Sequence, residues 1–133
     1  MPKSSRDKGA QGERELIAEI EQWTGLRLQR NLSQAFAGGH DLIGLDDFAI
    51  EVKRYRDITD ADKKLFWHQA CKQADPIGKI PVVCFRQDRQ PWRVLLPHES
   101  DFYNTEDYRQ TVEIGLELFL SLIHISEPTR PFH

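Results

Sequence analysis

Residues 80–85 constrain the fold of this chain more than any other segment. They read IPVVCF, so nearly every position is apolar, whereas a strand with one wet face alternates apolar and polar residues. A continuous apolar strand is typical of a sheet whose two faces are both covered by helices. Residues 9–23 and 61–74 carry apolar residues at helical spacing and can supply those helices. The segment therefore predicts a central strand in an α/β protein.

The other expected elements are short and are separated by turn-forming residues. Asp46-Asp47 forms a tight turn between two of them, so we expect a hairpin there. The expected helices are 9–23, 61–74 and 99–118, and the expected strands are 26–32, 42–45, 48–53, 80–85 and 92–96. This order predicts a mixed sheet with helices on its faces.

The composition of the 133 residues is that of one globular domain, with 39% hydrophobic and 29% charged residues. The net charge of -3 neither supports nor excludes DNA as a partner. Cys71 and Cys84 lack the spacing of a zinc site and indicate buried, reduced thiols of a cytoplasmic protein. No apolar run is long enough to span a bilayer, so we expect no membrane partner.

Asp41, Glu51 and Lys53 are charged residues in apolar, strand-like surroundings. Residues two apart in a strand share a face, so Glu51 and Lys53 project together while Ile50 and Val52 turn into the core. Asp41 lies at the start of the preceding expected strand, directly before residues 42–45. Two converging carboxylates can hold a hard divalent cation, and a neighbouring lysine can orient an attacking water. These residues therefore predict metal-assisted cleavage of a phosphodiester.

These motifs and the order of elements resemble the PD-(D/E)xK nuclease superfamily, and within it the archaeal-type Holliday-junction resolvases, including versions carried by phages. The resemblance covers residues 8–97. It rests on KGAQGERELI at 8–17, on the segment from Arg30 through DLI at 41–43 to IEVK at 50–53, and on GKIPVV at 78–83 with Trp92-Arg93. It implies a restriction-endonuclease-like mixed sheet flanked by helices, with a C-terminal helix.

The resemblance also implies an active site made of acids, a lysine and a supporting glutamine. The implied catalytic residues are Glu13, Asp41, Glu51, Lys53 and Gln69. Asp41, Glu51 and the main-chain carbonyl of Val52 are the expected metal ligands, and Glu13 reaches the metal directly or through water. The expected ion is Mg²⁺, with Mn²⁺ able to substitute.

Basic and hydroxyl side chains are expected to contact the DNA backbone. The candidates are Lys8, Arg14, Arg30, Ser33, Arg54 and Arg56. Ser33 lies where the family carries a serine-rich phosphate-contacting segment, although residues 34–37 depart from that pattern. His40 also departs, because superfamily members often have proline or a small residue at this position.

The expected function is that of a metal-dependent DNA endonuclease, specifically a structure-selective Holliday-junction resolvase in DNA recombination and repair. A resolvase cuts two strands symmetrically, so we expect a homodimer with two-fold symmetry. Its expected location is the cytoplasm of a bacterial, archaeal or phage-infected cell. Two alternatives stay open. One is a restriction-like or recombination-associated nuclease on linear or single-stranded DNA, and the other is a catalytically silent DNA-binding module on the same fold.

The chain is expected to divide into four parts. These are a flexible basic N-terminus at 1–8, a nuclease domain at 9–97, a helical extension at 98–119 and a tail at 120–133. Residues 120–130, LSLIHISEPTR, resemble a translated sequencing adapter. We therefore expect the tail to be non-native and not to pack against the sheet. The alternative is a true amphipathic helix that ends at Pro128.

Overall fold

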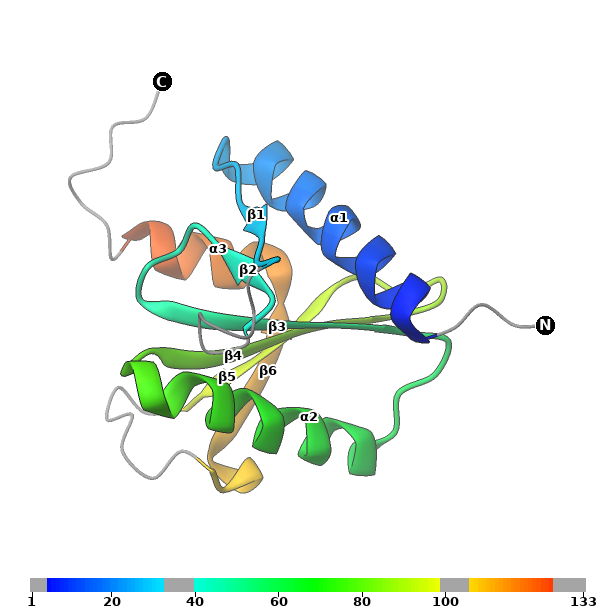
Figure 1. Cartoon of the computed structure of the whole chain (residues 1–133), viewed down its shortest axis with the longest axis vertical. Coiled ribbons are helices and arrows are strands. Elements are labelled where there is room, and N and C mark those ends of the chain that lie inside the picture. The colour runs from blue at the N-terminus through cyan, green and yellow to red at the C-terminus, as the bar shows by residue number, and fades with distance from the viewer. Residues whose placement is uncertain (1–4, 33–39, 99–105, 126–133) are drawn as a thin grey trace.

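The strands lie in the sheet in the same order as in the chain, from β1 to β6, with helices on both faces (Figure 1). The computed structural model describes residues 5–32, 40–98 and 106–125. Its elements are α1 (Ser5–Thr24), β1 (Gln29–Arg30), β2 (Leu42–Ile43), β3 (Phe48–Tyr55), α2 (Asp60–Ala74), β4 (Ile80–Gln87), β5 (Arg93–Pro97), β6 (Thr111–Gly115), α3 (Leu116–Ile125) and two 3₁₀ helices, η1 (Asp75–Ile77) and η2 (Tyr108–Gln110).

The centre of the sheet is the parallel pair β3 and β4. Their register runs from Phe48 opposite Ile80 to Tyr55 opposite Gln87, and the other strand pairs are antiparallel. Parallel neighbours need a crossover connection, and α2 provides it. The predicted mixed α/β sheet is therefore confirmed. A strand was expected at residues 26–32, but in the structure only Gln29–Arg30 form a strand, which is β1.

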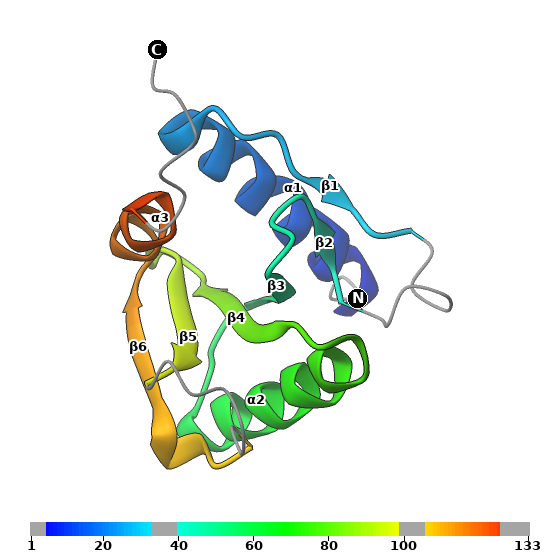
Figure 2. The same cartoon turned by 90° about the vertical axis from the view of Figure 1, so that its left-hand side faces the viewer.

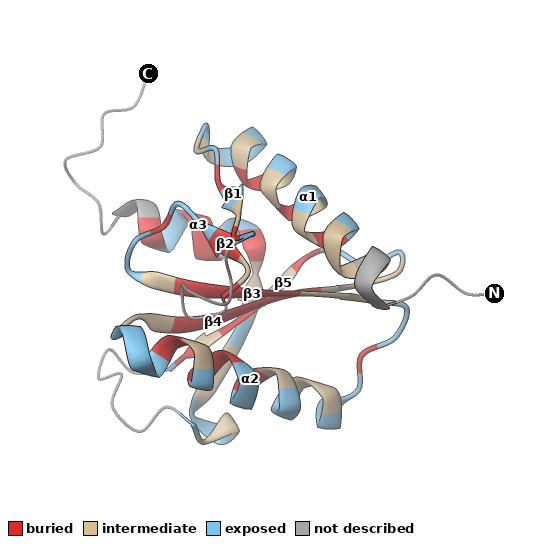
Figure 3. Cartoon of the chain, in the orientation of Figure 1, coloured by how far each residue is buried: buried red, intermediate tan, exposed pale blue. Residues whose placement is uncertain are grey.

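Successive residues of the central strands face two separate apolar clusters. Val82 and Cys84 pack in the cluster that includes the buried residues of α1 and α3. Val83 and Phe85 pack in the cluster that includes α2. Figure 2 shows α1 and α3 on one side of the sheet and α2 on the other, and Figure 3 shows the buried centre between them. Burial on both faces explains why residues 80–85 are apolar throughout.

The helices that carry site residues are fixed at particular positions. A Cβ atom at Gly12 of α1 would lie 2.5 Å from the Cβ of Arg54, so only glycine permits this approach of α1 to β3. A capping box begins α2, in which Thr59 Oγ1 accepts from Asp62 N (3.1 Å) and Thr59 N donates to Asp62 Oδ2 (2.9 Å). The predicted helix start at Thr59 or Asp60 is confirmed.

The C-terminal part differs from the helix predicted at 99–118. The structure instead has η2, then strand β6, and α3 begins only at Leu116. β6 pairs antiparallel with β5, from Arg93 opposite Gly115 to Pro97 opposite Thr111. The sheet therefore does not close at residue 96, and part of the expected helical extension is a sixth strand. Three of the four residues in TVEI at 111–114 are β-branched, which favours a strand.

Helix α3 crosses the expected boundary of the tail at residue 120. Leu120 is 3% exposed and Ile123 is 7% exposed, and both join the cluster beneath α1 and α3 with Leu116 and Phe119. The expectation that no residue from 120 onward packs against the sheet is therefore wrong for these two side chains. Residues 126–133 and residues 1–4 lie outside the described part of the chain. Within that part, every helix is too short or too polar to cross a membrane.

Candidate active site

Asp41 and Glu51 form a pair of carboxyl groups, of which Glu51 is buried and Asp41 is half-buried. Glu51 lies in β3 and is 2% exposed, and Asp41 directly precedes β2. A hydrogen bond between the two side chains lowers the pKa of Asp41 and raises the pKa of Glu51. Among the described residues, Glu51 Oε1 has no hydrogen-bond partner. The predicted convergence of the two acids is therefore present in the fold.

Burial dominates the electrostatics of this pair. It raises the pKa of Asp41 to about 6 and the pKa of Glu51 to about 8. The charge of Asp41 raises the pKa of Glu51 further, whereas the hydrogen bond from the backbone N–H of Val52 opposes the rise in the pKa of Asp41. A buried and a half-buried carboxyl group that lie together with an unpartnered oxygen are costly without a compensating cation. The donor set suits a hard divalent ion.

Three hydrogen bonds hold Asp41 between β1 and β3. Its N–H donates to Ile50 O (2.8 Å), and its carbonyl accepts from Asn31 N (2.8 Å). Its Oδ2 accepts from Val52 N at 2.6 Å. The side chain of Asp41 therefore bonds to the backbone of the Glu-x-Lys strand itself.

Lys53 projects from β3 toward α2. Its Nζ donates to Gln69 Oε1 at 2.7 Å and lies 5.3 Å from the centroid of the Phe66 ring. Ile50 and Val52 pack in the opposite cluster, beneath α1 and α3. The predicted division of the strand, with charged residues on one face and apolar residues on the other, is confirmed, and Gln69 is in contact with Lys53.

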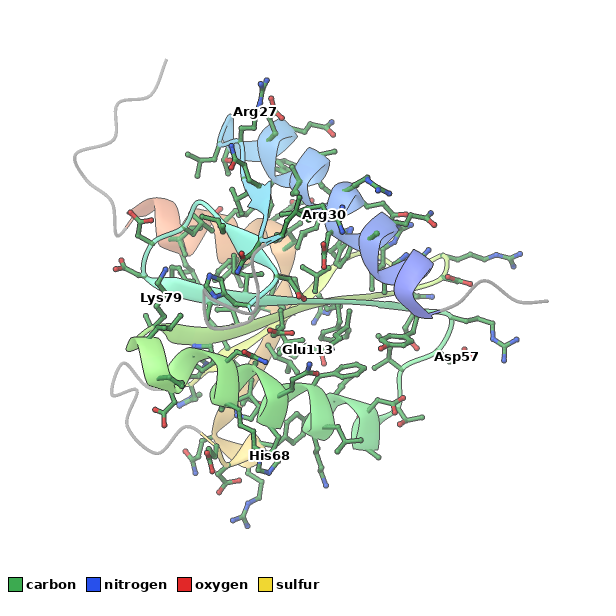
Figure 4. The ribbon with its side chains drawn as sticks, viewed as in Figure 1. Arg27, Arg30, Asp57, His68, Lys79 and Glu113 are labelled. Atoms are coloured by element: carbon green, nitrogen blue, oxygen red, sulfur yellow. The ribbon has the colours of Figure 1, made fainter. Side chains whose placement is uncertain are left out.

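Glu13 lies on α1, and its carboxylate forms an ion pair with Arg30. Its Oε1 accepts from Arg30 Nε at 2.7 Å, and the two side chains are 13% and 30% exposed (Figure 4). The charge of Glu13 contributes to the raised pKa values of Asp41 and Glu51. Within the described ranges, no three His, Cys, Asp or Glu side chains are grouped to hold one ion. The structure thus gathers two of the three predicted acids.

Comparison with known proteins identifies a family for this chain. Residues 4–119 match the model of a family described as "Phage putative PDDEXK endonuclease". This chain belongs to that PD-(D/E)xK endonuclease family. It is also 26% identical to Protein D14 of Escherichia phage T5 over 116 aligned positions, and the match covers 72% of this chain and 72% of that protein. The structure of Hjc, a Holliday junction resolvase from Archaeoglobus fulgidus, covers 84% of this chain and 87% of its own, with 19% identity and a TM-score of 0.47.

Membership in this family makes the protein a nuclease that acts on DNA. PD-(D/E)xK nucleases generally use divalent metal ions, and the acidic pair described above has the chemistry to bind one. The roles of individual side chains do not follow from membership alone.

The candidate DNA contacts of the endonuclease fall into different environments. Arg54 is the main correction, because its side chain is only 13% exposed and is bonded to Glu15 and Asp88. Arg86 also donates to Glu15, at 3.0 Å. Arg54 is therefore part of an internal ion-pair network that joins α1 to β3 and β4, and it does not face solvent as a phosphate contact would.

The remaining basic candidates of the endonuclease are more accessible or lie outside the described side chains. Arg14 is exposed on α1. Arg56 is exposed after β3, and its Nε donates to Asp57 Oδ2 at 3.0 Å (Figure 4). The side chain of Lys8 and all of Ser33 fall in the part that is not described, as do residues 34–37.

One buried polar residue beside the acids was missed by the sequence analysis. Asn31 follows β1, is 3% exposed, and donates from Nδ2 to His40 O at 2.9 Å. Its position in an otherwise apolar and basic alternation is the only sequence signal. The backbone contact across to Asp41 could not be read from that signal.

Proposed function

We propose that this endonuclease hydrolyses DNA phosphodiester bonds at the site formed by Asp41, Glu51 and Lys53, with Mg²⁺ as the preferred ion and Mn²⁺ able to substitute. The observation that carries the proposal is the carboxyl pair of Asp41 and the buried Glu51, in which Glu51 Oε1 has no hydrogen-bond partner and both pKa values are raised. Such a pair is costly for folding and is therefore typical of a functional site.

The ion would be held by Asp41, Glu51 and the main-chain carbonyl of Val52. When bound, it supplies positive charge against the phosphorane-like transition state and lowers the pKa of water. Asp41 is held in place by Val52 N, so its carboxylate has little freedom to turn away. Glu13 would join directly or through water once Arg30 bonds to a DNA phosphate instead.

Lys53 is proposed to orient the attacking water and to stabilise negative charge on the phosphoryl oxygens. Gln69 holds its ammonium group by a hydrogen bond, and the Phe66 ring lies beneath the same group. These two contacts from α2 restrict the rotamers of a long, flexible side chain. Gln69 therefore acts by placing Lys53.

Arg14, Arg30, Arg56, Lys8 and Ser33 are proposed to bind the DNA backbone. Contacts of this kind position the duplex without reading bases. They also make affinity depend steeply on salt, since each neutralised phosphate releases counterions. Arg54 is omitted from the set because its charge is balanced internally.

The proposed substrate is a four-way DNA junction, cut by a homodimer in recombination or repair. The motif resemblance over residues 8–97 supports this choice, and symmetric cutting requires two-fold related sites. The alternative substrate is linear or single-stranded DNA, which a nuclease that also uses Glu13, Asp41, Glu51 and Lys53 could cleave. A silent DNA-binding module is disfavoured, because it gains nothing from keeping this acid pair.

The test is cleavage of a four-way junction and of a linear duplex with matching arms, each with Mg²⁺ and with EDTA. We expect Mg²⁺-dependent, paired cuts in the junction and at least ~10-fold slower cutting of the duplex, a difference of about 1.4 kcal/mol in activation free energy. Equal cleavage of both substrates would overturn the junction assignment. Cleavage that persists in EDTA would overturn the metal assignment.

A further inference from the structure

Asn31 is a buried amide that bonds to the residues beside the acid pair. It is 3% exposed, and buried polar side chains in proteins are hydrogen-bonded with few exceptions. Its Nδ2 donates to His40 O at 2.9 Å, and its backbone N donates to Asp41 O at 2.8 Å. A single residue after β1 therefore holds two consecutive carbonyl groups.

These bonds fix both peptide planes that flank the Cα atom of Asp41. His40 O and Asp41 N belong to one planar peptide group. Asn31 Nδ2 holds this group at the oxygen, and Ile50 O holds it at the nitrogen, 2.8 Å away. Asp41 O belongs to the following peptide group, which Asn31 N holds. The backbone torsions of Asp41 are thus set by its neighbours, and Val52 N sets its carboxylate.

We propose that Asn31 is a positioning residue for Asp41, acting through the His40–Asp41 peptide group. The inference rests on the proposed function, in which Asp41 is a metal ligand. Productive sites need their groups held within about 0.5 Å. Groups that orient metal ligands typically contribute 10–100-fold to metal affinity or activity. The bond from Asn31 N survives any substitution except proline, so the side-chain bond to His40 O is the one that mutation removes.

The test compares Asn31→Leu, which has a similar size and no donor, with wild type and with Asp41→Asn. Mn²⁺ affinity is measured by electron paramagnetic resonance without DNA. The amide resonance of Val52 is followed in metal-free, ¹⁵N-labelled protein, because this N–H reports the Asp41 carboxylate. We expect at least ~10-fold weaker Mn²⁺ binding in Asn31→Leu, a shifted or broadened Val52 resonance, and unchanged DNA affinity in EDTA.

A control of matched stability separates positioning from general destabilisation. Val94→Ala removes buried volume from β5. Val94 is 0% exposed and belongs to the apolar cluster beneath α1 and α3. We expect it to lower the thermal midpoint while leaving Mn²⁺ affinity within about twofold of wild type, since β4 separates its strand from β3. Where Asn31→Leu does not fold, Asn31→Ser, which keeps a small polar group, takes its place in every measurement.

The outcomes distinguish the inference from the proposed function. Wild-type Mn²⁺ affinity in the Asn31 variant, together with its loss in Asp41→Asn, overturns the role of Asn31 and leaves the metal site standing. Equal weakening in Val94→Ala also overturns it, because stability alone would then explain the effect. No Mn²⁺ binding by wild type and unchanged cleavage by Asp41→Asn would instead overturn the proposed function.

Discussion

At the scale of single residues, burial decides the chemistry of the acid pair. Glu51 is 2% exposed, and its carboxyl group remains largely protonated near neutral pH because its pKa is raised to about 8. A divalent ion would displace that proton, so metal binding and proton release are coupled. The spacing of Asp41, Glu51 and Lys53 in the sequence predicted that they converge. It did not indicate how deeply they lie, because the burial of a side chain depends on how the rest of the fold packs around its strand.

Asp41→Asn and Glu51→Gln should each abolish cleavage and leave DNA binding in EDTA intact or tighter. The substitutions remove the ionised oxygens that a hard cation requires and also remove negative charge near the phosphate backbone. Single-turnover cleavage and binding isotherms measure the two effects separately. Activity within tenfold of wild type in either variant would contradict the assignment.

The metal-free protein should become less stable as pH rises from about 4 to about 8. The native state holds protons on Asp41 and Glu51 with pKa values of about 6 and about 8, above their ordinary values of 3.8 and 4.5. Between the unfolded and folded pKa values the native state binds more protons, so the unfolding free energy falls with pH. Thermal midpoints in EDTA should show this fall, and Glu51→Gln should flatten it. A midpoint that rises across this window in wild type would refute the pKa assignment.

Lys53→Ala should lower the single-turnover cleavage rate ~100-fold or more, the scale of losing a group that stabilises developing charge. Metal affinity should change little, because lysine is not a ligand. Gln69→Ala should reduce the rate less, since it removes only the partner that places the ammonium group. Full recovery of Lys53→Ala at high DNA concentration would show that Lys53 binds DNA and does not act in the chemical step.

At the scale of elements, local patterns predicted the central strands and α2 but missed β6. Residues 80–85 are apolar because both faces of β4 are covered, and Thr59 caps α2 through local bonds, so both signals lie within the segments themselves. β6 is held by its pairing with β5, a partner that its own sequence does not specify. The acidic residues in and around β6 made this segment resemble a surface helix in the sequence.

Arg54→Ala and Arg56→Ala form a matched pair that tests how α1 is joined to the sheet. Arg54 bonds to Glu15 of α1 and to Asp88 and is 13% exposed, whereas the side chain of Arg56 is 81% exposed. Arg54→Ala should lower the thermal midpoint by several degrees, since it removes the ion pairs that Arg54 makes with Glu15 and Asp88. Arg56→Ala should leave the midpoint unchanged and reduce the salt dependence of DNA binding by about one phosphate contact. The reverse pattern would restore Arg54 as a DNA contact.

At the scale of the whole molecule, two apolar clusters on opposite faces of one sheet hold the site between them. Glu51 and Lys53 lie on the face of α2, while Glu13 is carried by α1 on the other face. The site therefore depends on the relative placement of both layers. Sequence motifs identified which residues belong to the site, but the ion pair of Glu13 with Arg30 depends on the approach of α1 to β1.

Removing residues 120–133 should lower the thermal midpoint, although the sequence alone predicted no effect. Leu120 and Ile123 are 3% and 7% exposed in the cluster beneath α1 and α3, and burying such a side chain contributes about 1.5–3 kcal/mol. The double variant Leu120→Ala/Ile123→Ala should reproduce most of the loss. Its control, Leu118→Ala/Leu122→Ala, alters side chains of the same type that are 51% and 47% exposed and should cost little. An unchanged midpoint after truncation at Phe119 would show that these side chains do not pack natively and would favour the interpretation of residues 120–133 as foreign sequence.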